Sequence, residues 1–259
     1  MFLNKLNCKF GWHTWEYSEK YKTCSHCPAQ RYSVQRLRDT KTRRVINMLV
    51  ASVAIFVSIP IMLLIGVLIK LTSRGPIIYR QIRVGLNRRG DVEIDRRDPP
   101  HGIDRREVDV GGTPFVIYKF RTMTVDESNV QVWAKKDDPR VTRVGSFLRK
   151  YRLDELPQLF NVLKGDMNIV GPRPEQPLLF LEMHNQIVDY SKRQDVLPGI
   201  TGLAQVSQSA DTSFQDVLNK LVWDLEYVNT LSTKRDLGIM IRTVPVMVFQ
   251  NYRKGQLNN

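Results

Sequence analysis

The chain has 259 residues and a formal net charge of +13 at pH 7, enough length for one main domain with attached segments. This charge predicts a negatively charged partner, such as anionic lipid headgroups or nucleic acid. Residues 1–22 are mixed and polar, so we expect no secretory signal peptide there.

All three cysteines lie near the amino terminus: Cys8, Cys24 and Cys27. Together with His13 they provide three thiolates and one imidazole, a full tetrahedral shell for structural zinc. Because about thirty residues cannot build a stable core alone, a metal would have to stabilise this segment. We therefore predict a zinc-ribbon-like module with structural Zn²⁺ at residues 1–30. Reduced surface thiols or a redox pair are the alternatives.

An apolar run covers residues 45–71 and contains one charge, Lys70, and a central proline, Pro60. It is long enough to cross a membrane. Six Lys/Arg lie before it, between Arg31 and Arg44, and six lie at and beyond its end, between Lys70 and Arg89. The positive-inside tendency would place both flanks on the cytoplasmic side. We therefore predict a re-entrant helix-break-helix that bends at Pro60, with the Ser58 hydroxyl satisfying a freed carbonyl. The alternatives are a kinked helix that spans the membrane and a buried core helix.

Most of the excess positive charge flanks this apolar run. Anionic lipid headgroups attract such juxtamembrane basic residues by about 1 kcal/mol each. Nucleic acid would attract a similar charge, but an apolar run of this length favours lipid, so we expect no nucleic-acid partner.

The rest of the chain predicts an α+β fold with a small sheet component and amphipathic surface helices. Residues 91–114 indicate an Arg-rich inserted loop, and residues 115–118 a short buried strand. Apolar spacing predicts helices at 144–152, after Asp154 and Glu155, and around 218–228. The expected segments are a zinc module (1–30), basic flanks with the membrane hairpin (31–90), the loop (91–114), a catalytic core (115–209) and C-terminal amphipathic helices (210–259).

The adjacent carboxylates Asp154 and Glu155 stand where two predicted helices join. Such a pair can divide two roles, since one carboxylate can attack phosphorus and the other can hold a divalent cation. An acidic pair that only stabilises a helix amino terminus is the structural alternative.

Five short segments combine around this pair: 119–123 (Lys-Phe-Arg-Thr-Met), 153–158 (Leu-Asp-Glu-Leu-Pro-Gln), 161–166 (Asn-Val-Leu-Lys-Gly-Asp), 171–174 (Gly-Pro-Arg-Pro) and 198–206 (Pro-Gly-Ile-Thr-Gly-Leu-Ala-Gln-Val). In this combination the chain resembles the bacterial sugar transferase family, the small monotopic phosphoglycosyl transferases that use polyprenyl phosphate. The resemblance covers about residues 41–250.

The resemblance implies that Asp154 is the nucleophile and that Glu155 is the Mg²⁺ partner. A nucleoside diphosphate sugar would phosphorylate Asp154 with its sugar phosphate, which then passes to polyprenyl phosphate, expected to be undecaprenyl phosphate. The enzyme would act at the cytoplasmic face of the bacterial inner membrane and initiate a lipid-linked glycan. Downstream glycosyltransferases and a second copy of the chain are further candidate partners.

Cationic side chains near these motifs are candidate phosphate ligands, because a transferring phosphoryl group needs fixed positive charge. Arg173 stands between two prolines and can bind a phosphate in bidentate fashion. The other candidate substrate contacts are Lys119, Arg121, Arg149, Glu175 for the nucleoside, and Gln205 as a polar ligand contact.

The chain departs from the family pattern at Ile59, which precedes Pro60 where members carry serine, at Arg152, and in the Arg-rich insert. A membrane-tethered nucleic-acid binder would leave Asp154 and Arg173 unexplained. A catalytically inactive scaffold for glycan assembly is the second rival, and activity alone distinguishes it.

Overall fold

The computed structural model describes residues 41–87, 112–124, 138–208 and 213–248, and three short strands that precede them. Its contacts divide the chain into two compact units, Met1–Thr40 and Lys41–Asn259. In the first unit, β1 (Trp15–Tyr17), β2 (Tyr21–Cys24) and β3 (Gln30–Tyr32) form an antiparallel sheet in that order.

The predicted zinc site falls mostly outside the described residues. Cys8, His13 and Cys27 are not among them, and Cys24 is described only as the last residue of β2. Within the part of the chain that the structure describes, there is no group of three His, Cys, Asp or Glu side chains that could hold a metal ion. The zinc module therefore stays a prediction.

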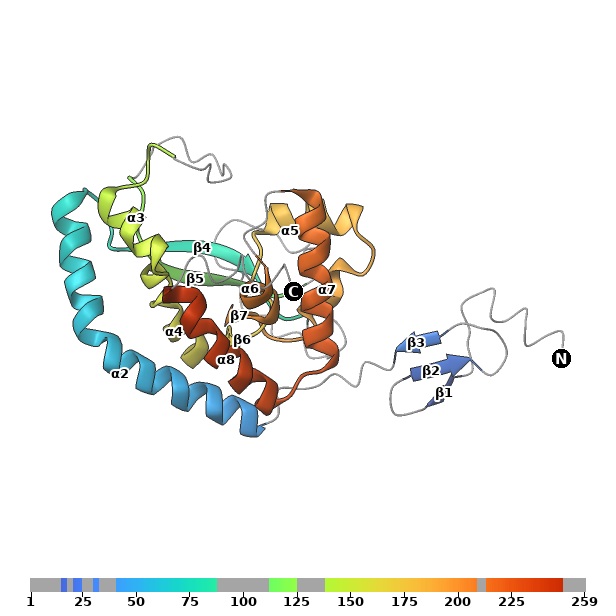
Figure 1. Cartoon of the computed structure of the whole chain (residues 1–259). Helices are drawn as coiled ribbons and strands as arrows, with labels where there is room; N and C mark the ends of the chain where they lie inside the picture. Colours follow the sequence, from blue (N-terminus) through green and yellow to red (C-terminus); the bar gives the residue numbers. More distant parts are fainter. Residues whose placement is uncertain are drawn as a thin grey trace, which may run out of the picture. The chain divides into compact units, whose positions relative to one another are not determined.

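The second unit begins with α2 (Lys41–Thr72), a helix of 32 residues that contains Pro60. Figure 1 shows that α2 bends strongly about half-way along its length. Proline lacks an N–H group and clashes with the preceding turn, which explains a bend at this place. The helical pattern nevertheless continues through Pro60, so the predicted break is a kink within one helix.

Ser58 lies next to this kink, and its hydroxyl donates to the carbonyl oxygen of Ile55 at 3.2 Å. The carbonyl that loses its helical donor to Pro60 is that of Phe56, one residue further on. Ser58 therefore bonds the neighbouring carbonyl and not the freed one.

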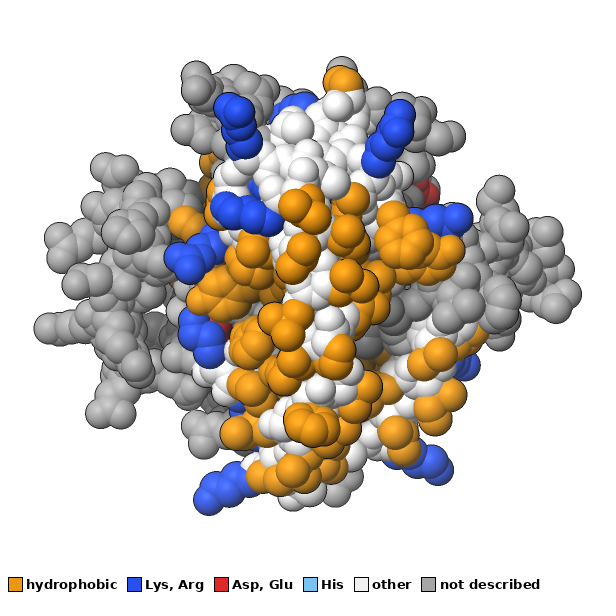
Figure 2. All heavy atoms as spheres, turned by 90° about the vertical axis from the view of Figure 1, so that its left-hand side faces the viewer, with side chains coloured by type: hydrophobic (Ala, Val, Ile, Leu, Met, Phe, Trp, Pro, Cys, Tyr) orange, Lys and Arg blue, Asp and Glu red, His pale blue; other side chains and the backbone are white. Residues whose placement is uncertain are grey.

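Much of the surface of α2 is apolar and exposed. Phe56 is 78% and Val57 72% exposed, which rules out a helix buried in the protein core. Figure 2 shows a continuous apolar band with Lys and Arg side chains around its margins. Among the described residues, α2 is the one helix with the length and composition to cross a membrane. The apolar band is therefore suited to hydrocarbon, with the basic margins at the headgroups.

The five sequence motifs are carried by a helix-rich body with two small sheets, so the predicted α+β class is confirmed. β4 (Ile78–Val84) pairs antiparallel with β5 (Pro114–Phe120), and β6 (Asn168–Val170) pairs parallel with β7 (Gly199–Thr201). The helices are α3 (Arg143–Lys150), α4 (Gln158–Lys164), α5 (Pro177–Gln186), α6 (Leu203–Ser207), α7 (Phe214–Asn229) and α8 (Thr233–Val248), with 3₁₀ turns η1 (Leu153–Glu155) and η2 (Tyr190–Gln194).

Several predicted elements match this arrangement. The strand expected at 115–118 lies within β5, and the three expected helices correspond to α3, α4 and α7. β4 was missed, because its arginines were interpreted as a basic flank of the membrane segment. The short elements β6, β7 and α6 were missed too, since they carry too few residues for a periodic pattern. Residues 88–111, most of the Arg-rich insert, lie outside the described residues.

Polar side chains attach the first half of α2 to the body. Arg43 is buried and its Nε donates to Asp236 Oδ2 of α8 at 2.6 Å. Asn47 accepts a bond from the Ile169 backbone N–H at 2.7 Å. Arg44 donates to the Val162 and Leu163 carbonyls at the end of α4. An apolar helix is thus positioned by specific polar bonds, which fix its register against β6 and α4.

The Arg43–Asp236 pair gives the first testable prediction. Arg43→Met leaves the Asp236 carboxylate buried without its cation, so the free energy of unfolding should fall by about 3 kcal/mol. Denaturant unfolding of the protein in lipid nanodiscs measures this. The double variant Arg43→Met/Asp236→Leu should recover most of the loss. An Arg43→Met variant as stable as the wild type would contradict a stabilising role for the pair.

Candidate active site

Asp154 and Glu155 lie in the 3₁₀ turn η1, between α3 and α4. Arg152 enters this turn with φ 54° and ψ 22°, a left-handed conformation that residues other than glycine rarely adopt. Such backbone strain concentrates at functional sites, where surrounding contacts maintain it. Pro157 then precedes the first residue of α4. The turn therefore places the two carboxylates at the join between α3 and α4, where the sequence predicted two helices to meet.

Glu155 is the buried member of the pair, with 6% of its surface exposed. Its Oε1 accepts bonds from Lys119 Nζ at 3.0 Å and from Arg173 Nη2 at 2.9 Å. Its Oε2 lies 3.6 Å from Arg152 Nη1. Burial alone would raise the pKa of Glu155, but Arg173, Lys119 and Arg152 outweigh it and hold that pKa well below its usual value. Glu155 is therefore a carboxylate whose ionised form is favoured by three surrounding cations.

Asp154 is half-buried, and no described residue makes a hydrogen bond or ion pair with its carboxylate. Burial, and then the charge of Glu155, raise the pKa of Asp154, while Lys119, Arg173 and Arg149 oppose this rise. Two adjacent carboxylates whose pKa values are shifted in opposite directions are typical of sites in which the two groups have different chemical roles. Asp154 is the one whose oxygens remain available to a substrate.

Arg149 contacts Thr122 through a hydrogen bond, and Arg121 directly precedes Thr122 in the chain. The two arginines nevertheless bond different parts of the protein. Arg149 donates from Nε to Thr122 Oγ1 at 2.8 Å, and its charge acts on Asp154. This approach needs a glycine at Gly145 of α3, where a Cβ atom would lie 2.0 Å from the Thr122 carbonyl oxygen. Arg121 instead donates to the carbonyls of Ser73 and Arg74 just after α2, at 2.8 and 2.7 Å. Arg149 thus belongs to the carboxylate site, and Arg121 holds the end of α2.

Glu175 was predicted to contact the nucleoside, and the structure shows it buried in a charge network. It accepts bonds from Arg193 at 3.1 Å and Lys220 at 2.7 Å. Burial alone would raise the pKa of Glu175, but these two cations lower it well below its usual value. Arg193 also donates to Asp224 and to the backbone carbonyl of Arg173, at 2.7 and 3.0 Å. This network fixes the loop that carries Arg173.

Sequence reasoning missed Arg83 of β4, a further cation near the carboxylates. Its Nη1 donates to the Pro174 carbonyl at 3.2 Å. Burial and the charge of Arg173 lower the pKa of Arg83 to about 10. The run Ile77 to Val84 is rich in Ile, Tyr and Val, a composition that indicates a strand containing Arg83. Its contact with the Gly-Pro-Arg-Pro loop is seen only in the fold.

A chamber of about 170 Å³ adjoins Glu155. Gln205, a predicted ligand contact, lines it. Its Nε2 donates to the Ile200 carbonyl at 3.0 Å, whereas its buried Oε1 has no hydrogen-bond partner among the described residues. Gln205 can therefore accept one bond from a ligand. The walls of this catalytic chamber comprise Ala54, Arg152, Glu155, Leu156, Leu159, Ile200, Thr201, Gln205, Val206, Thr243 and Val246.

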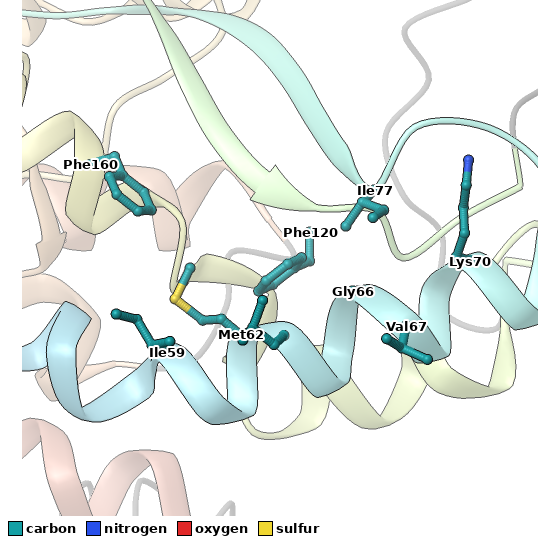
Figure 3. Close-up of a pocket in the computed structure, with 9 residues that line it drawn as sticks. Ile59, Met62, Gly66, Val67, Lys70, Ile77, Phe120 and Phe160 are labelled. Carbon is teal, nitrogen blue, oxygen red and sulfur yellow. The ribbon is translucent and has the colours of Figure 1, made fainter.

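A larger apolar groove of about 500 Å³ lies along the second half of α2. Figure 3 shows Ile77, which directly precedes β4, and Phe120, the last residue of β5, facing α2, with Phe160 of α4 on another side. Lys70 points away from the apolar side chains in this view, and its Nζ donates to the Gly75 carbonyl at 3.1 Å. No predicted catalytic residue lines this groove.

Comparison with known proteins identifies the family of the chain. The sequence profile described as "Bacterial sugar transferase" matches residues 38–91 and 92–250. The chain belongs to the bacterial sugar transferase family. The family and the transferase class that the sequence predicted are thereby confirmed.

Individual relatives differ in their sugar and in their length. The chain is 37% identical to the UDP-glucose:undecaprenyl-phosphate glucose-1-phosphate transferase of Caulobacter vibrioides, over 80% of this chain and 69% of that protein. It is 37% identical to the protein of the same name from Klebsiella pneumoniae, over 78% of this chain but 39% of that longer protein. It is 41% identical to a Bacillus subtilis protein named "Putative undecaprenyl-phosphate N-acetylgalactosaminyl 1-phosphate transferase", over 58% and 72% of the two chains.

The second prediction concerns Arg193 as a positioning residue for Arg173. Lysine keeps the charge but cannot donate to Glu175, Asp224 and the Arg173 carbonyl together. Because misplacing a substrate-binding group can cost up to about 10²-fold, Arg193→Lys should lower kcat/KM by about 10- to 100-fold. Steady-state kinetics of sugar-phosphate transfer measures this. The neighbouring Lys192 makes an exposed pair with Asp189, so Lys192→Ala is the matched control and should keep wild-type kinetics. Equal kinetics for both variants would refute the positioning role.

Proposed function

We propose that this protein transfers a sugar phosphate from a nucleoside diphosphate sugar to polyprenyl phosphate through a covalent intermediate on Asp154. The observation that carries this proposal is the contrast between Asp154, half-buried with available oxygens, and Glu155, buried and ion-paired. The printed names of the relatives support undecaprenyl phosphate as the acceptor and a UDP-sugar as the donor. Because those names include two different sugars, the sugar itself is left open.

In the first step, a carboxylate oxygen of Asp154 attacks the phosphorus that carries the sugar. The bond from that phosphorus to the bridging oxygen breaks, and the nucleoside monophosphate leaves with the electron pair. Charge on the transferred phosphoryl oxygens would lie near Arg149, Arg173 and Lys119, whose charges already act on Asp154. Fixed cations of this kind stabilise the transition state without reorganisation.

In the second step, an oxygen of the polyprenyl phosphate attacks the same phosphorus. The bond from phosphorus to Asp154 breaks, which regenerates the carboxylate and releases polyprenyl diphosphosugar. This product would initiate a lipid-linked glycan. The apolar band of α2 supports such a role, because it would keep the site at the level of the lipid phosphates.

Glu155 could hold the predicted Mg²⁺. Its Oε1 is occupied by two donors, whereas Oε2 faces only Arg152 at 3.6 Å and keeps lone pairs for a hard cation. A divalent cation there would neutralise charge on the donor diphosphate. Structural Zn²⁺ on Cys8, His13, Cys24 and Cys27 is the second proposed metal.

We further propose a re-entrant topology for α2 on the cytoplasmic face of the inner membrane. The two halves of the bent helix both contact the same body: Arg44 and Asn47 reach α4 and β6, and Ile65 and Ile69 pack with Leu148 of α3. The basic margins of the apolar band support contact with anionic inner-leaflet lipids. A straight spanning helix would not return to the same body.

Removal of the nucleophile is the decisive experiment. Asp154→Asn should abolish both turnover and the phosphosugar adduct that mass spectrometry detects on quenched wild-type enzyme. A loss of at least about 10³-fold is expected, because the covalent route is closed. Glu155→Gln is the matched comparison, and it should still form some adduct because its carboxamide leaves Asp154 in place. Full turnover of Asp154→Asn would exclude the covalent mechanism and leave the scaffold or direct-transfer alternatives.

The pH dependence tests the same assignment. Asp154 attacks only when ionised, and its pKa lies above the ordinary value of 3.8. Activity should therefore fall, as the pH decreases, at a higher pH than an ordinary aspartate would require. The pKa of Glu155 is lowered, so Glu155 stays ionised throughout this range. The acid limb of kcat/KM against pH measures this. Arg149→Met removes a cation that lowers the pKa of Asp154, so it should move the limb further upward.

A further inference from the structure

The catalytic chamber joins the carboxylate site to the two helices with exposed apolar faces. Glu155 and Arg152 contribute charged groups to its lining, whereas Ala54 of α2 and Val246 of α8 contribute apolar walls. Outside the chamber, α2 exposes Val53 and Phe56, and α8 exposes Leu237, Ile241 and Val244. The chamber is thus bounded by the catalytic turn and by the surfaces best suited to hydrocarbon.

We propose that the catalytic chamber binds the first isoprenoid units of the acceptor, the hydrocarbon directly attached to its phosphate. This inference rests on the proposed function. It assigns a site to the part of the acceptor that must approach Asp154 most closely.

The walls favour hydrocarbon over a sugar or a nucleoside. Thr201 and Thr243 are the hydroxyl residues of the chamber, and both are already bonded: their Oγ1 atoms lie 2.8 Å apart and Thr243 donates to the Ile239 carbonyl at 2.8 Å. Apart from charged Arg152 and Glu155, this leaves Gln205 Oε1 as an available polar atom. A sugar or base would lose hydrogen bonds with water that this lining cannot replace. A branched hydrocarbon loses none.

The charge of Arg152 would orient such a ligand, because it attracts the phosphate end of the acceptor. Arg152 contacts Glu155 only at 3.6 Å, and its side chain is 30% exposed, so it can turn toward an incoming phosphate. With the phosphate beside Arg152, the hydrocarbon would extend toward Ala54 and Val246. The chamber volume of about 170 Å³ is far too small for a long polyprenyl chain, so the rest of that chain would stay in the bilayer.

The larger groove along α2 is less suited to this part of the acceptor. It has no residue of the carboxylate site in its lining, and its one charged side chain, Lys70, donates to the Gly75 carbonyl. Substitutions in that groove therefore serve as a control for general effects on lipid contact.

Filling the chamber tests the proposal. Ala54→Leu and Ile200→Phe each add side-chain volume to its walls. For both variants, KM for undecaprenyl phosphate and for a short isoprenoid phosphate such as farnesyl phosphate should rise about tenfold or more. Release of nucleoside monophosphate from the donor in a single turnover without acceptor should stay at the wild-type rate. Val67→Phe, which fills the larger groove, should change neither measurement.

The outcomes separate this proposal from the proposed function. Unchanged acceptor kinetics in a filled variant that still releases nucleoside monophosphate would overturn the chamber assignment alone. If the wild type shows no acceptor-independent release, the covalent mechanism fails instead. If a filled variant loses donor turnover, Ile200→Ala, which enlarges the chamber, is the variant that tests the assignment. It should raise the acceptor KM with normal donor turnover, and an unchanged KM would overturn the assignment.

Discussion

A buried carboxylate that must be neutralised organises the centre of this molecule. Glu155 is almost fully excluded from water, and an isolated charge in that position would be strongly unfavourable. It is stable there because Lys119 arrives from β5 and Arg173 from the loop after β6. The Arg173 backbone is in turn held in place by the bond from Arg193 to its carbonyl. The requirement to neutralise one anion thus brings three distant segments of the chain together.

The same arrangement explains why Asp154 and Glu155 behave differently although they are neighbours. The turn directs one carboxylate toward the cations and leaves the other partly open to the surroundings. Burial then acts on both, but only Glu155 has direct ion pairs to offset it. The difference in their pKa values comes from geometry and not from residue type, since Asp and Glu have similar ordinary values. A 3₁₀ turn is enough to produce it.

Sequence reasoning predicted that the carboxylate pair, Lys119, Arg149 and Arg173 belong to one site, because they stand in motifs whose combination is specific, and the fold brings them together. It could not separate Arg121 from them. All are cations near motifs, and only the fold shows that the Arg121 guanidinium bonds the carbonyls after α2. Glu175 and Arg193 show a similar limit, because a buried charge network joins residues far apart in the chain. Long-range pairing of this kind leaves no periodic pattern. The helices α4 and α7, by contrast, followed from their apolar spacing, and Pro60 correctly indicated the bend in α2.

The bonds of Arg121 have a consequence for how deeply the enzyme sits. They join the residues after the carboxyl end of α2 to Arg121, which directly follows β5 and stands two residues from Lys119, while Arg44 joins the amino end of α2 to α4. Both ends of the lipid-facing helix are therefore fastened to elements that carry or adjoin the reactive turn. The depth at which Asp154 and Glu155 would lie relative to the bilayer is therefore set by how α2 is bonded to the body of the protein. Adaptation to a thicker or thinner bilayer would then have to come from side chains along the helix, because the distance from these anchoring bonds to Asp154 is set by the fold.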